Sequence, residues 1–63
     1  METLNRIKQL VELMEVDTEK VYAKGNHSAS IRARKSAQEI KILIGKFRKE
    51  LLEEIKNHDG TEN

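Results

Sequence analysis

The residues of this sequence that are best suited to chemistry are basic, and they are concentrated in its middle. Residues 24–49 hold eight Lys or Arg side chains and one acidic residue, Glu39, whereas acidic residues predominate on both sides. The formal net charge of +1 hides this segregation. A charge run is usually a solvated face balanced by acids, but like charges without such balance slightly destabilise a helix. The pattern therefore favours an anionic partner, of which a phosphate backbone is the commonest.

No arrangement typical of an enzyme accompanies these cations. The sequence has no Cys, and His27 and His58 lie far apart without the spacing of a metal site. No base is placed to activate Ser28 or Ser36 as a nucleophile. We therefore expect no catalytic residue, no cofactor, no metal and no small-molecule substrate.

Two helices are predicted to position the basic residues. The chain has no Pro, and apolar residues recur at spacings of three and four in both halves. The predicted stripe of the first half is Leu4, Ile7, Val11, Met14 and Val21, with Thr18 at a polar position of the seam. The predicted stripe of the second half is Ala33, Ala37, Ile40, Ile44, Phe47 and Leu51.

The predicted fold is all-α, a single antiparallel two-helix hairpin spanning residues 1–63. Its helices are expected at about 3–24 and 28–57, joined by a turn at 25–27 and followed by a polar end at 58–63. A short connection between two helices makes them antiparallel neighbours.

Helix boundaries are predicted from capping residues. Thr3 is the expected N-cap of the first helix, and Gly25 is expected to end it in the left-handed conformation. Either Asn26 or Ser28 then caps the second helix. Asp17 would suit a break in the first helix, but one continuous helix is favoured.

Association of two hairpins is also predicted. A chain of 63 residues, 37% hydrophobic and without Trp or Cys, has a thin core and no disulfide to reinforce it. Edge residues such as Leu10, Leu43 and Leu52 are expected to stay half exposed in a lone hairpin. A homodimer forming a four-helix bundle would cover them.

Five cations of the second helix are expected to share one side of it, with Arg32 and Lys46 on the opposite flank of the seam. Arg34, Lys41 and Arg48 recur every seven residues, and Lys35 and Lys49 occupy the adjacent row. The residues predicted to bind phosphate are Lys24, Arg32, Arg34, Lys35, Lys41, Arg48 and Lys49.

The stretch KGNHSASIRARKSAQEIKILIGKFRKE, residues 24–50, resembles the core of the bacterial linker-histone-like proteins typified by the small chlamydial nucleoid proteins. A Gly-Asn turn leads to small residues, a basic R-x-R-K-like step and a helix that ends in an aromatic residue followed by Arg and Lys. The residues that carry the likeness are Gly25, Asn26, Ala29, Arg32, Arg34, Lys35, Ser36, Glu39, Phe47, Arg48 and Lys49. The resemblance implies a DNA-binding, DNA-compacting protein of the bacterial nucleoid. Family members commonly carry a Lys/Ala/Pro-rich tail, so this chain, with its acidic end, is expected to be a short form without that tail.

The leading prediction is sequence-independent binding of double-stranded DNA by a homodimer, through its phosphates, in the cytoplasm at the nucleoid. No side chain is obviously set to read base edges. No apolar run is long enough to span a membrane, and residues 1–15 do not form a signal peptide. The alternative is a helical protein–protein interaction module whose basic face is only solvated.

Overall fold

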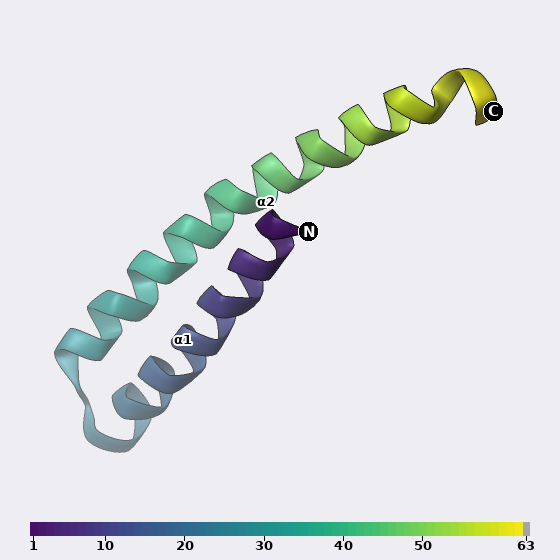
Figure 1. The fold of residues 1–63 in the computed structure, drawn as a ribbon. Coiled ribbons are helices and arrows are strands. Elements are labelled where there is room, and N and C mark those ends of the chain that lie inside the picture. Colours follow the sequence, from purple (N-terminus) through teal and green to yellow (C-terminus); the bar gives the residue numbers. More distant parts are fainter. Residues whose placement is uncertain (63) are drawn as a thin grey trace.

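Two helices and a tight turn make up the computed structural model, which describes the backbone of residues 1–62 and the side chains of residues 1–58. Helix α1 spans Glu2–Lys24 and helix α2 spans His27–Glu62, and residues 1–62 contain no strand. The helices lie side by side and run in opposite directions (Figure 1). The molecule measures 55 × 16 × 14 Å along its principal axes. The prediction of an all-α antiparallel hairpin is confirmed.

The turn has the local chemistry that the sequence predicts. Gly25 adopts the left-handed conformation, with φ 62° and ψ 31°, where a side chain would be strained. The amide groups of Gly25 and Asn26 donate to carbonyl oxygens in the last turn of α1, at 2.8 and 3.3 Å. The side-chain oxygen of Asn26 accepts a hydrogen bond from the Ala29 amide at 3.0 Å. Asn26 therefore caps α2, and Ser28 lies within that helix.

The seam between the helices follows alternating spacings of four and three residues, as in a coiled coil. Its buried and half-buried positions on α1 are Thr3, Ile7, Leu10, Met14, Asp17 and Val21. Those on α2 are Ala29, Ala33, Ser36, Ile40, Leu43, Phe47 and Glu50.

The predicted apolar stripes were wrong in one respect, because each included a set of residues beside the seam. Leu4, Val11 and Thr18 are exposed on α1, as are Ala37, Ile44 and Leu51 on α2. Leu10 and Leu43, expected at half-exposed edges, lie in the seam, and Leu10 is only 2% exposed. Hydrophobic periodicity alone placed part of each predicted stripe on the wrong flank of its helix. Four seam positions carry polar side chains, and a search for apolar residues does not select them.

Three of the four polar seam residues make hydrogen bonds between the helices. The Thr3 hydroxyl donates a hydrogen bond to the Glu50 carboxylate at 3.0 Å. Thr3 therefore lies inside α1, which begins at Glu2 without a side-chain cap, and the prediction of Thr3 as N-cap was wrong. Asp17 accepts hydrogen bonds from Arg32. The expected continuity of α1 through Asp17 is confirmed.

Helix α2 continues well past the end of α1 (Figure 1). The contact between Thr3 and Glu50 marks the last level at which the helices meet, so α2 extends by about 18 Å as an overhang, residues 51–62. Its end lies five residues beyond the expected 57. Most polar residues there are helix formers, and Gly60 costs only about 1 kcal/mol in a helix. Asn63, the last residue of the expected polar end, lies outside the described residues.

The hairpin buries few apolar side chains. Among the described side chains, only Ile7, Leu10 and Ala29 are both apolar and buried. A large set of apolar residues is at least one-third exposed, including Leu4, Val11, Ile44, Leu51, Leu52 and Ile55. A core of this size provides limited stability for a chain without disulfides.

Neither helix, within residues 1–62, combines the length and the apolar character that a membrane crossing requires.

Candidate nucleic-acid interface

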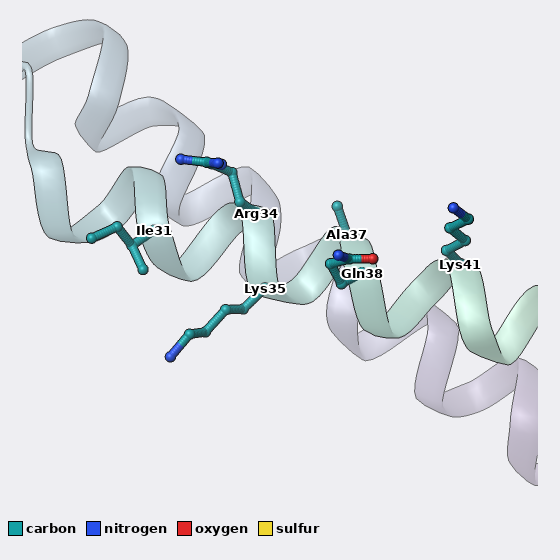
Figure 2. Close-up of a pocket in the computed structure, with 6 residues that line it drawn as sticks. All are labelled: Ile31, Arg34, Lys35, Ala37, Gln38 and Lys41. Carbon is teal, nitrogen blue, oxygen red and sulfur yellow. The ribbon is translucent and has the colours of Figure 1, made fainter.

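The basic residues of α2 form two rows rather than one. The first, here called the arginine row, is Arg34, Lys41 and Arg48; the second, the lysine row, is Lys35 and Lys49. Neighbouring residues are rotated by about 100° around a helix, so the rows diverge. Figure 2 shows Arg34 and Lys41 leaving one side of α2 and Lys35 leaving the opposite side. The expected single basic side is therefore two surfaces, each about 21 Å long.

Two ion pairs identify the side of the hairpin to which the lysine row belongs. Arg6 of α1 pairs with Glu39 of α2, and Arg32 of α2 pairs with Asp17 of α1. A shallow groove on this side is lined by Lys35 together with Asp17 and Arg32. We call this side the charged edge, defined by Arg6, Asp17, Lys20, Arg32, Lys35, Glu39 and Lys46.

The arginine row lies toward the other side of the hairpin. Leu4 and Val11 each follow a seam residue of α1, and Ile44 and Leu51 each follow a seam residue of α2. Arg6 and Glu39, by contrast, each precede a seam residue, so helical rotation places the two sets on opposite flanks. We call this flank, which carries exposed aliphatic residues from both helices and no ion pair among the described side chains, the apolar edge, defined by Leu4, Val11, Ala37, Ile44 and Leu51.

Arg32 already has a partner within the hairpin. Its Nε and Nη2 atoms donate to Oδ1 of Asp17 at 3.2 and 3.1 Å. The Asp17 side chain is 11% exposed and that of Arg32 is 52% exposed. The pair therefore connects α1 to α2 and neutralises a nearly buried carboxylate. Two of the five guanidinium N–H donors are used in this way, and a phosphate contact by Arg32 stays a prediction.

The single acid among the cations of α2 does not balance them. The Glu39 carboxylate accepts from Arg6 Nε at 3.2 Å and from Nη2 at 3.4 Å, across the two helices. The structure shows no ion pair, among the side chains that it describes, for either row of α2. Both rows are thus exposed cations whose charge is not neutralised within the hairpin.

Two cations outside the predicted set of phosphate-binding residues join the charged edge. Lys20 of α1 lines the same groove as Arg32 and Lys35. Lys46 of α2 lines a second groove with Arg6. Lys20 belongs to the acidic first half of the chain, so only the fold reveals its position. The position of Lys46 can be predicted from the sequence, because Lys46 follows Arg32 by two heptads and therefore lies on the same flank of α2.

Lys24, the remaining predicted residue, lies at the turn end of the hairpin, nearer to Arg32 than to Lys49. It ends α1 beside the turn, about 30 Å from the level of Lys49. The charged edge therefore offers an extended series of cations rather than a pocket, which suits a repeating chain of phosphates better than one small anion.

Within the described side chains, no group of His, Cys, Asp or Glu is arranged to hold a metal ion.

Comparison with known proteins gives one match. The model of a family described as histone H1-like protein Hc1 matches residues 1–57, which include all of α1 and α2 as far as Asn57. The matched region is wider than the 24–50 stretch whose residues carry the resemblance. No curated protein and no solved structure matches this chain.

Proposed function

The chain belongs to the histone H1-like Hc1 family, a family of DNA-binding nucleoid proteins, and we propose that it binds double-stranded DNA through phosphate contacts without reading base sequence. In this proposal it acts as a homodimer in the cytoplasm, associated with the nucleoid, and contributes to DNA compaction. Histone-like DNA-binding families are generally non-enzymatic.

The observation that carries this proposal is the set of unneutralised cations on α2. The arginine and lysine rows have no ion pair among the described side chains, and Glu39 is used by Arg6. Like charges along one helix are mildly unfavourable in the free protein. Binding to DNA relieves this repulsion and releases the counterions condensed on the phosphates.

The geometry favours backbone contacts over base readout. Lys35, Lys41 and Lys49 are point charges on flexible stems, and the rows run along an exposed helix surface. A specific reader would present several side chains that form paired hydrogen bonds with base edges, and in the two rows only Arg34 and Arg48 have that capacity. We therefore propose DNA as the partner and its phosphates as the groups recognised, irrespective of sequence.

A protein-interaction module remains the second candidate, because the overhang is amphipathic. Leu51, Leu52 and Ile55 are 47, 63 and 65% exposed on its apolar face. Docking of a different protein on this face would leave the two cation rows without a function. DNA binding uses these rows, so it is the leading proposal.

Binding to two short duplexes of unrelated sequence, measured by fluorescence anisotropy at several salt concentrations, tests the proposal. We expect equal affinities for the two duplexes. About four to six phosphate contacts per dimer would give a slope of log K against log salt of roughly −4 to −5. Absence of binding at low salt would refute DNA binding, and strong preference for one duplex would refute sequence independence.

A further inference from the structure

The charged edge has cations at its two ends and a neutral stretch between them. Three cations line the groove nearest to the turn, here called the turn end: Lys20, Arg32 and Lys35. The opposite end, here called the far end, carries Lys46 and Lys49. The exposed lysine row therefore starts at the turn end and stops at the far end.

The neutral centre of this edge combines an ion pair with an exposed aliphatic residue. Arg6 and Glu39 neutralise each other there at 3.2 Å. Ile42 is 71% exposed, more than any other large aliphatic side chain that the structure describes. It lies halfway along the lysine row, seven residues from the lysine on either side. The row is thus interrupted by an apolar side chain that the hairpin does not cover.

The acids near the two ends do not pair with these lysines. Asp17, at the turn end, is already neutralised by an arginine. Glu2 lines the groove of Lys46, and Glu53 follows Lys49 by four residues, but none of these forms an ion pair with another among the described side chains. Lysines at both ends are therefore free to bind an anion, and the turn end has the larger net positive charge.

The distance between the two ends matches the separation of phosphates across a groove of DNA. Lys35 and Lys49 are fourteen residues apart, which is about 21 Å along α2. The major groove of B-DNA is about 12 Å wide, and the phosphate groups on its rims add to the distance between their charges. The minor groove is only about 6 Å wide. The flexible lysine stems accommodate the remaining difference at the major groove more easily than at the minor groove.

We propose that the charged edge lies across the major groove, with its two ends on phosphates of opposite strands and Ile42 over the groove between them. This inference rests on the proposed function and deepens it, because it specifies how the hairpin is oriented on DNA. A hairpin lying along one strand would place the whole lysine row beside phosphates, and an aliphatic residue at its centre would forfeit a contact. Across a groove the centre meets no phosphate, so a neutral centre costs no affinity.

This orientation agrees with binding that is independent of base sequence. The centre of the edge is the part that faces the bases when the ends rest on the rims of the groove. Its polar groups bond to one another, since Arg6 donates to the Glu39 carboxylate and to the Gln9 side chain. The exposed aliphatic chain of Ile42 offers no hydrogen bond to a base edge.

An added lysine distinguishes a hairpin across the groove from one along a strand. Ile42→Lys places a cation at the neutral centre, and Val16→Lys places one at the turn end, beside Lys20 and Lys35. Both variants replace an exposed β-branched residue, 71 and 53% exposed, and both add the same charge. Lysine is also the better helix former, so both should keep the helicity of the wild type in circular dichroism.

The measurement is the slope of log K against log salt for one short duplex, by fluorescence anisotropy. We expect Val16→Lys to increase the magnitude of the slope by about 0.9 per protomer engaged, and Ile42→Lys to change it by less than about 0.3. Equal increases would place a phosphate opposite the centre and overturn the orientation. No increase from either variant would show that the turn end does not contact phosphate, which overturns it as well.

Substituted duplexes of one sequence identify the groove. Bulky groups on C5 of the pyrimidines project into the major groove, whereas groups of the same size on N2 of guanine project into the minor groove. We expect the C5 groups to weaken binding by about tenfold and the N2 groups to leave it within about twofold. The opposite result, or equal effects, would overturn the assignment to the major groove while the proposed function stands. Absence of binding to the unmodified duplex at low salt would overturn both.

Discussion

The two edges of the hairpin differ in chemistry although the same two helices form them. On the charged edge, Arg6 reaches Glu39 and Arg32 reaches Asp17, so the helices are connected by ion pairs across the seam. On the apolar edge, Val11 is 43% exposed and Ile44 is 44% exposed. Charges paired within the monomer need no further partner, whereas exposed aliphatic surface is stabilised only by being covered.

The comparison also separates the cations by their surroundings. Arg32 and Arg6 are paired with acids inside the hairpin. Lys35 and Lys49 are exposed on the same edge, and no acid among the described side chains pairs with them. A list of basic residues therefore mixes cations that connect the two helices with cations that have no acidic partner among the described side chains, and only the contacts of each side chain distinguish them.

The largest effect is expected from the seam on which both edges depend. Leu10→Ala removes the most buried of the large apolar side chains, which is 2% exposed, and should lower the free energy of unfolding by about 2–5 kcal/mol. For a chain this small, that is close to complete unfolding. Circular dichroism during urea denaturation measures the change. Leu52→Ala, at a position 63% exposed on the overhang, is the control and should alter stability much less. Equal losses would show that the seam is not where the structure places it.

The ion pair between Arg32 and Asp17 should have the next largest effect on stability. Arg32→Ala leaves the Asp17 carboxylate, 11% exposed, without its partner, and this should cost about 1–3 kcal/mol of stability. The double variant Arg32→Ala/Asp17→Ala removes the charge as well as its partner. It should recover part of the loss, and chemical denaturation of both variants measures the coupling. No recovery would show that the two side chains do not interact in solution.

The two rows should then differ in their effect on DNA binding. Lys35→Gln/Lys49→Gln should reduce the magnitude of the salt slope by about 2 per protomer engaged and weaken binding roughly tenfold. Arg34→Gln/Lys41→Gln should change the slope less, because these residues border the exposed aliphatic residues of the apolar edge and lie away from the other cations of the charged edge. Fluorescence anisotropy at several salt concentrations measures both, and the two variants are matched in the charge that they remove. Equal slopes would show that both rows contact phosphate alike.

The smallest effect is expected at the exposed pair of the charged edge. Arg6 and Glu39 are each 46% exposed, so Arg6→Gln should cost only about 0.2–1 kcal/mol at low salt. Salt screens exposed charges, so this difference should shrink further as the ionic strength rises. Denaturation at two salt concentrations measures it. A loss as large as that of Arg32→Ala would contradict the difference in burial between the two pairs.

Several parts of the fold follow from local sequence. Gly25 is predicted to end a helix because it tolerates positive φ, and its φ is 62°. Asn26 is predicted as a cap because its short side chain reaches a backbone amide, and it accepts from Ala29. The family resemblance was likewise readable from the order of turn, basic step and aromatic residue. It is confirmed by the match over residues 1–57.

The residues of the seam between the helices could not be predicted from local sequence. Thr3 and Asp17 face α2 although they are polar, because Glu50 and Arg32 offer them partners far away in the sequence. A pattern of hydrophobicity assigns such positions to solvent and moves the predicted stripe toward Leu4 and Val11. Lys20 was missed as part of the charged edge for the same reason, since it joins that edge only when α1 folds back on α2.

The sequence by itself determined the number of helices, the position of the turn and the segregation of charge, because helix propensity, capping and composition act within a few residues. Only the tertiary structure decided which flank of each helix faces the other, which arginine is used in an ion pair, and which edge of the hairpin each row of cations joins. These outcomes depend on contacts between residues 15 to 47 positions apart, such as Asp17 with Arg32 and Thr3 with Glu50. Such contacts form only after the backbone has been brought together, when burial makes each unpartnered polar atom costly.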